Sequence, residues 1–157
     1  MLRRLVSALV VGLLCTAGVT VAGPAQAVNI GNEGCTPGYW KNHMDNWEEY
    51  SPGTVVGDVF EFSGTDAAIA AYADTTFAQA LRLQGGSGLD GATRILLRAA
   101  VAATLNAAHE GLGYPLRRGG TDGIFAMVNE ALASGDRATI LELARYLDSL
   151  NNLGCPL

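Results

Sequence analysis

The sequence predicts an all-helical domain, a small bundle or orthogonal array of four to five helices whose two ends are clamped by a Cys35 to Cys155 disulfide. Two observations favour helices: apolar residues recur at helical spacing, as in Leu97, Val101 and Leu105, and glycine-rich segments separate the patterned stretches. A third is that the two cysteines flank the whole patterned region. Short connections between helices are typical of a bundle.

An export signal precedes this domain. Arg3 and Arg4 lead into an apolar run over residues 5–22, and Pro24 comes before a small-residue cleavage site that ends at Ala27. The sequence therefore predicts a signal peptide over residues 1–27, a flexible lead over 28–34 and a single helical domain over 35–157. An uncleaved membrane anchor is the alternative, since the apolar run is close to the length that spans a bilayer.

Cys15 is expected to leave with the signal, which leaves Cys35 and Cys155 in a compartment where disulfides form. Their pairing would close a loop of about 120 residues, for which chain entropy gives roughly 4 to 5 kcal/mol of stabilisation. The alternative is a pair of free thiols that bind a metal, although metal-binding cysteines usually come as closely spaced pairs.

The charge of the chain excludes some partners. Cleavage removes Arg3 and Arg4 and no acidic residue, so eight Lys and Arg face fifteen Asp and Glu, a net charge of −7. Proteins that bind phosphate backbones are basic, so we expect no nucleic-acid partner and, after signal cleavage, no membrane partner. The expected location is secreted, extracellular or in the cell envelope.

The first expected helix covers residues 37–50. Thr36 is placed to cap it, and Pro37 suits the first helical position. The helix would carry four residues along one face: Trp40, His43, Met44 and Trp47. Gly38 weakens the first turn, so an irregular aromatic loop is the competing form.

The middle of the chain is less regular. Residues 55–62 fit either a short strand or one turn of helix that packs Val59 and Phe60. From Asp66 an alanine-rich stretch predicts a long helix to about residue 84, which the sequence Gly85-Gly-Ser-Gly88 ends. We interpret that glycine-rich segment as a linker turn, because no strand precedes it and no lysine follows it.

The last three helices have the strongest patterns. The first runs over about 90–110 and carries Arg94 and Arg98, which we expect to pair with acidic neighbours or solvent. After a loop over 114–120, Thr121 or Asp122 is expected to cap a helix that Gly135 ends. Asp136 then caps the final helix, which has a clean stripe of apolar residues: Ile140, Leu143, Leu147 and Leu150.

Three segments resemble a family of small secreted bacterial proteins and modules. They are Cys35-Thr-Pro-Gly-Tyr-Trp-Lys-Asn-His43, Leu96-Leu-Arg-Ala-Ala-Val-Ala-Ala-Thr-Leu-Asn-Ala-Ala-His109 and Leu147-Asp-Ser-Leu-Asn-Asn-Leu-Gly-Cys-Pro-Leu157. The resemblance covers nearly all of the chain after the signal. It implies an extracellular domain with paired terminal cysteines, and it transfers no catalytic residue.

The two histidines, His43 and His109, are the candidate metal ligands. The groups near them in sequence are Asp45, Glu48, Glu49, Glu110 and Asn106. Two imidazoles with one of these carboxylates would suit zinc, copper or iron if folding brought the first and third helices together. The alternative is structural: His43 packs among the aromatic rings with a ring nitrogen bonded to a carbonyl or to Asn42, and His109 contacts the carbonyls at a helix end.

Other catalytic patterns are weak. The sequence holds no Gly-x-Ser-x-Gly elbow, its serines after the signal fall at expected turns or helix ends, and its acidic pairs are those that any acidic protein has. The protein is therefore expected to be non-enzymatic and to use no cofactor. The alternative is a secreted metal-binding protein or metal-dependent hydrolase that uses His43 and His109.

A dense aromatic segment is the candidate binding surface. Four large rings lie within twelve residues, and exposed rings of this kind stack on sugars or anchor a protein partner. Buried, they would seat the first helix, and we expect at least Trp40 to be buried. The leading hypothesis is surface recognition of a glycan or envelope protein through a set of six residues: Tyr39, Trp40, Lys41, Asn42, Trp47 and Tyr50.

Overall fold

The computed structural model describes residues 31–157; the predicted signal, Cys15 and residues 28–30 of the predicted lead lie outside this range. The described residues form six α-helices and two 3₁₀ turns, with no strand beyond two isolated bridges. The all-helical prediction is confirmed. The elements are α1 (Pro37–Asn42), η1 (Met44–Asn46), η2 (Val56–Asp58), α2 (Ala67–Ala70), α3 (Phe77–Ala80), α4 (Gly88–Ala108), α5 (Ile124–Ser134) and α6 (Arg137–Asn151).

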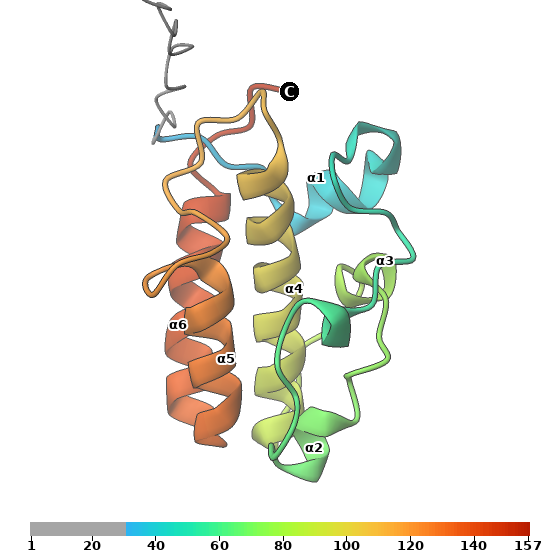
Figure 1. Ribbon diagram of the computed structural model, residues 1–157, viewed down its shortest axis with the longest axis vertical. Coiled ribbons are helices and arrows are strands. Elements are labelled where there is room, and N and C mark those ends of the chain that lie inside the picture. Colours follow the sequence, from blue (N-terminus) through green and yellow to red (C-terminus); the bar gives the residue numbers. More distant parts are fainter. Residues whose placement is uncertain (1–30) are drawn as a thin grey trace, which may run out of the picture.

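Helix α4 is the centre of the molecule, and each of the other five helices contacts it. The long helices α5 and α6 pack on one side, and the short helices α1, α2 and α3 with their loops cover the other (Figure 1). Every residue of α4 from Ala99 to Asn106 is buried. Small alanine side chains on several of its faces allow neighbouring segments to approach closely, so one helix can serve as the core for both layers.

The junction between α5 and α6 follows the predicted signals. Gly135 ends α5 in a left-handed conformation with φ of 60°, which glycine adopts without strain. The Asp136 side chain then accepts the Thr139 amide at 2.8 Å and caps α6. The prediction for the start of α5 was wrong: Gly123 stands at its N-cap, while Thr121 and Asp122 belong to the preceding turn.

The first predicted helix, over residues 37–50, is wrong beyond residue 42. Thr36 caps α1 as expected, but the backbone leaves the helix at His43. The Trp47 indole N–H donates to the Trp40 carbonyl at 3.0 Å, and its ring packs near Phe77. The chain therefore folds back as an irregular aromatic segment, which is the alternative that the sequence offered to a helix over residues 37–50.

The long helix predicted from Asp66 to about residue 84 is also wrong, because it is divided into α2 and α3. Thr76 begins a new helix with a capping box, in which its side chain and that of Gln79 satisfy each other's backbone N–H groups. The Val56 amide donates to the Thr75 carbonyl between the two helices. Residues 55–62 hold the single turn η2, with Phe60 buried and Val59 half-buried.

The disulfide between Cys35 and Cys155 is present, with the two Cα atoms 4.5 Å apart. Beside it, the Gly34 amide donates to the Gly154 carbonyl at 2.9 Å. A Cβ atom at Gly34 would lie 2.1 Å from the Leu150 carbonyl oxygen, so only glycine fits this approach. The start of the domain is thus fastened to the end of α6. None of the helices within residues 31–157 is long and apolar enough to cross a membrane.

Candidate functional site

One buried side chain, Asn106 of α4, bonds the start of the aromatic segment, residues 39–50, to the core. Its Oδ1 atom accepts the Cys35 amide and the Trp40 indole N–H, both at 2.9 Å. Its Nδ2 group donates to the Cys35 carbonyl and to Asn151 Oδ1, also at 2.9 Å. An asparagine side chain offers two acceptor sites and two donors, so Asn106 is fully satisfied.

The network continues through Asn151 of α6. Its Oδ1 atom also accepts the Tyr114 hydroxyl at 2.8 Å, and its Nδ2 group donates to the Ala99 carbonyl at 3.0 Å. Burial raises the pKa of the Tyr114 phenol, so its hydroxyl remains a donor. Every buried side-chain polar atom in the described part of the chain has a partner. The network ties the N-terminal segment, α4, α6 and the loop after α4 into one unit.

The structure divides the aromatic residues between core and surface. Trp40 is fully buried, as expected, which assigns it a structural role. Trp47 and Tyr50 are half-buried, and both rings pack against Phe77 of α3, at 6.5 and 5.3 Å between centroids. Tyr39 is half-buried, with its edge against Trp40.

The outer face of the segment carries a stacked pair of rings. Tyr39 and His43 lie 4.2 Å apart with 15° between their planes. The Asn46 amide donates to the Tyr39 hydroxyl at 2.9 Å, and Asn42 and His43 are exposed beside it. This face therefore combines flat rings with amide and imidazole groups.

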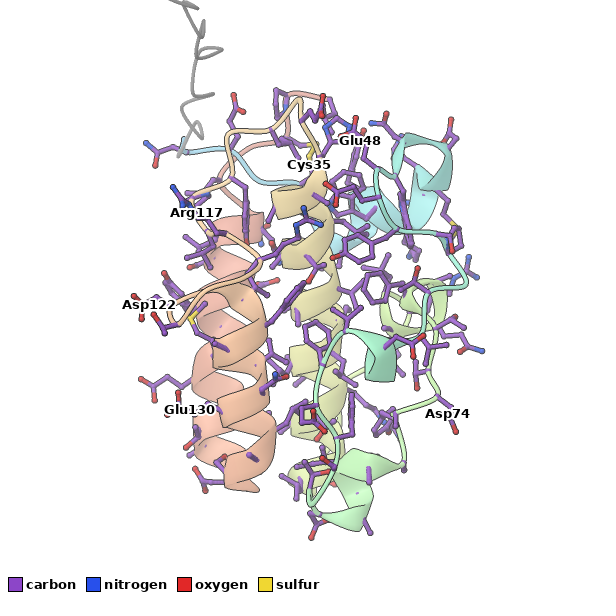
Figure 2. The ribbon with its side chains drawn as sticks, viewed as in Figure 1. Cys35, Glu48, Asp74, Arg117, Asp122 and Glu130 are labelled. Carbon is purple, nitrogen blue, oxygen red and sulfur yellow. A yellow bond between two sulfur atoms is a disulfide. The ribbon has the colours of Figure 1, made fainter. Side chains whose placement is uncertain are left out.

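Two acidic residues fasten the far end of the segment. A Glu48 carboxylate oxygen accepts the Glu110 amide at 2.6 Å, next to the end of α4. Glu49 makes two hydrogen bonds with Arg118, at 2.6 and 2.9 Å. Glu49 has φ of 60°, the only non-glycine residue with positive φ among those described, and this conformation strains any residue with a Cβ atom. Figure 2 shows Glu48 at the Cys35 end of the molecule, with Arg117 and Asp122 on the opposite flank.

The two histidines are each engaged in local contacts. Nδ1 of His43 pairs with the Tyr39 carbonyl at 2.9 Å, and because a carbonyl only accepts, Nδ1 carries the hydrogen. Nδ1 of His109 accepts the Gly111 amide at 3.0 Å, and its Nε2 lies 3.7 Å from Glu48. The His43 contact with a carbonyl is the expected one, whereas His109 contacts an amide and a carboxylate in place of the expected helix-end carbonyls. Within residues 31–157 no group of three or more His, Cys, Asp and Glu side chains is arranged to hold a metal.

The remaining predicted binding residue, Lys41, faces away from the stacked pair and lines a cleft with Arg82 and Arg98. Of the two arginines expected to pair with acids or solvent, Arg94 pairs with Asp90 at 2.9 Å, whereas Arg98 donates to the Leu83 carbonyl at 3.4 Å.

Sequence reasoning missed the residues that hold the segment in place: Asn106, Asn151, Tyr114 and Arg118. One signal was available for Asn106, since a lone asparagine follows Leu105 within an apolar helical pattern. The other partners depend on how distant segments meet. Comparisons of the chain with protein-family models, curated proteins and solved structures gave no match.

Proposed function

We propose that the protein is a non-enzymatic domain, secreted or in the cell envelope, that recognises an envelope glycan through the outer face of residues 39–46. The observation that carries this proposal is the stacked Tyr39 and His43 pair, flanked by Asn42 and Asn46. Flat rings with neighbouring amide groups suit a sugar, whose ring faces stack on aromatics and whose hydroxyls take hydrogen bonds.

The rigidity of the segment supports a binding role. The disulfide, the Asn106 network and the Glu49 to Arg118 pair fix an irregular segment at three places. A segment fixed in this way loses little conformational entropy when it binds. The strained backbone at Glu49 is a further indication, because such strain persists where the surroundings enforce one conformation and is frequent at functional sites.

The surface chemistry favours a glycan over a protein. A protein contact usually centres on exposed large apolar side chains. Those exposed within the described residues are Tyr146, Leu153 and Leu157, all outside this segment. The disulfide supports the proposed location, since disulfides persist in oxidising compartments.

The test is sedimentation of the exported protein with cell walls of the producing organism, prepared with and without protease treatment. The double variant Asn42→Ala/His43→Ala removes exposed groups, and we expect it to weaken binding about five- to thirtyfold while the melting temperature stays within a few degrees. The matched control is Thr121→Ala/Asp122→Ala in an exposed turn. Unchanged binding by Asn42→Ala/His43→Ala would refute the assigned face, and loss of binding after protease treatment would identify a protein partner instead.

A further inference from the structure

A cleft lies on the other side of α1, between the start of that helix, the end of α3, α4 and α6. Its volume is about 370 Å³, within the range of sites for small ligands. Three cationic side chains from three separate segments line it: Lys41 of α1, Arg82 after α3 and Arg98 of α4. One carboxylate, Asp148 of α6, lies on its wall.

This concentration of positive charge is unusual for the chain. Three of the eight Lys and Arg that follow residue 27 meet in one cleft, although acidic residues outnumber them almost two to one. The ion pairs among residues 31–157 involve Arg94, Arg118 and His109, so none of the three cleft cations has a carboxylate within 4.0 Å there. Like charges gathered in a concave surface repel one another, and a bound anion would remove that cost.

Two of the three cations are on anchored parts of the fold. Arg98 is half-buried, and one of its terminal nitrogens, Nη1, donates to the Leu83 carbonyl at 3.4 Å. This contact orients the guanidinium and leaves other N–H groups for a ligand. Lys41 is on α1, which the hydrogen bond from the Trp40 indole to Asn106 fixes to α4. The Arg98 guanidinium and the backbone that carries Lys41 are therefore in place before any ligand arrives.

We propose that this cleft binds the phosphate group of an extracellular sugar phosphate or polyol phosphate. Three cations that approach from three elements match the charge and the several oxygens of a phosphate, whereas a carboxylate needs a single arginine fork. Gln84, Asp148 and Asn152 also line the cleft and offer donors and acceptors for hydroxyl groups of the same ligand. The site is separate from the glycan face, because Tyr39 and Lys41 are two residues apart and so lie on different faces of α1.

The test is titration of the exported protein, with its disulfide formed, by calorimetry and by amide NMR shifts. The probes are inorganic phosphate, glycerol 3-phosphate and glucuronate. We expect both phosphate probes to shift the amides around the cleft, glycerol 3-phosphate to bind more tightly than inorganic phosphate, and glucuronate to bind more weakly. Lys41→Gln and Arg98→Gln should each weaken phosphate binding about tenfold or more.

Two further variants distinguish specific binding of phosphate in the cleft from non-specific attraction of an anion to positive charge. Asp148→Asn removes the one carboxylate and should strengthen binding of inorganic phosphate. Arg117→Gln changes the net charge equally at an exposed position that does not line the cleft, and it should leave the affinity unchanged. The proposal is overturned if neither phosphate probe saturates the cleft, or if glucuronate binds at least as tightly as the phosphate probes. It is also overturned if Arg117→Gln weakens phosphate binding as much as Arg98→Gln does. Each variant is first shown to keep its melting temperature, and none of these outcomes depends on glycan binding at residues 39–46.

Discussion

Replacement of Asn106 should remove more stability than any other single polar substitution in the described part of the chain. In Asn106→Ala, the buried Cys35 amide and the Trp40 indole N–H both lose their acceptor. Each buried donor without a partner costs about 1 to 3 kcal/mol, so we expect a loss of about 3 to 5 kcal/mol. That is a large part of a typical folding free energy, and the melting temperature should fall by roughly 10 to 20 °C.

The assay is urea denaturation followed by circular dichroism, with the disulfide kept oxidised. Asn106→Asp serves as a variant of equal size: it preserves the volume but cannot donate two hydrogen bonds, so it should also be strongly destabilised. Asn42→Ala makes the same chemical change as Asn106→Ala at an exposed position and should change the unfolding free energy by less than about 0.5 kcal/mol. A loss below about 1 kcal/mol for Asn106→Ala would show that the network does not hold the segment.

Three further perturbations test separate parts of the structure. Reduction of the disulfide between Cys35 and Cys155, which are 120 residues apart, should destabilise the domain by about 4 to 5 kcal/mol; equal melting temperatures with and without reductant would contradict this. At Glu49, where φ is positive, the glycine variant should be more stable than the alanine variant by about 1 kcal/mol in urea denaturation, and the reverse order would show that the backbone is unstrained. Hydrogen bonds from the Thr139 amide and hydroxyl lower the pKa of Asp136 below its ordinary value of 3.8. The stabilisation by this cap is therefore present above that value and is lost as the pH falls through the lowered pKa, so the wild-type advantage over Asp136→Ala should be larger at pH 7 than at about pH 2. An advantage that does not change with pH would refute the capping role.

The parts of the fold that the sequence predicted are those set by local signals. Helix α4 follows from a long apolar pattern, and the junction of α5 and α6 follows from Gly135 and Asp136. The disulfide followed from the number of cysteines left after the signal. For the helices, the deciding residues lie within the element itself. For the disulfide, two remaining cysteines can pair in only one way.

The parts that were missed depend on contacts between distant segments. The first helix ends early because the Trp47 indole takes up the Trp40 carbonyl, and helical spacing alone cannot show that competition. Asn106 binds Cys35 and Asn151, which are 71 and 45 residues away, so its role could not be derived from its neighbours in sequence. The cleft around Arg98 likewise exists only where four segments meet.

The most direct test of the recognition proposal is amide NMR of the labelled exported protein during titration with purified, protease-treated wall glycan. The proposal predicts saturable shifts at Tyr39, Asn42, His43 and Asn46, with α5 unaffected. Saturable shifts confined to other segments would contradict it. The absence of any shift, with glycan from walls that do sediment the protein, would contradict it as well.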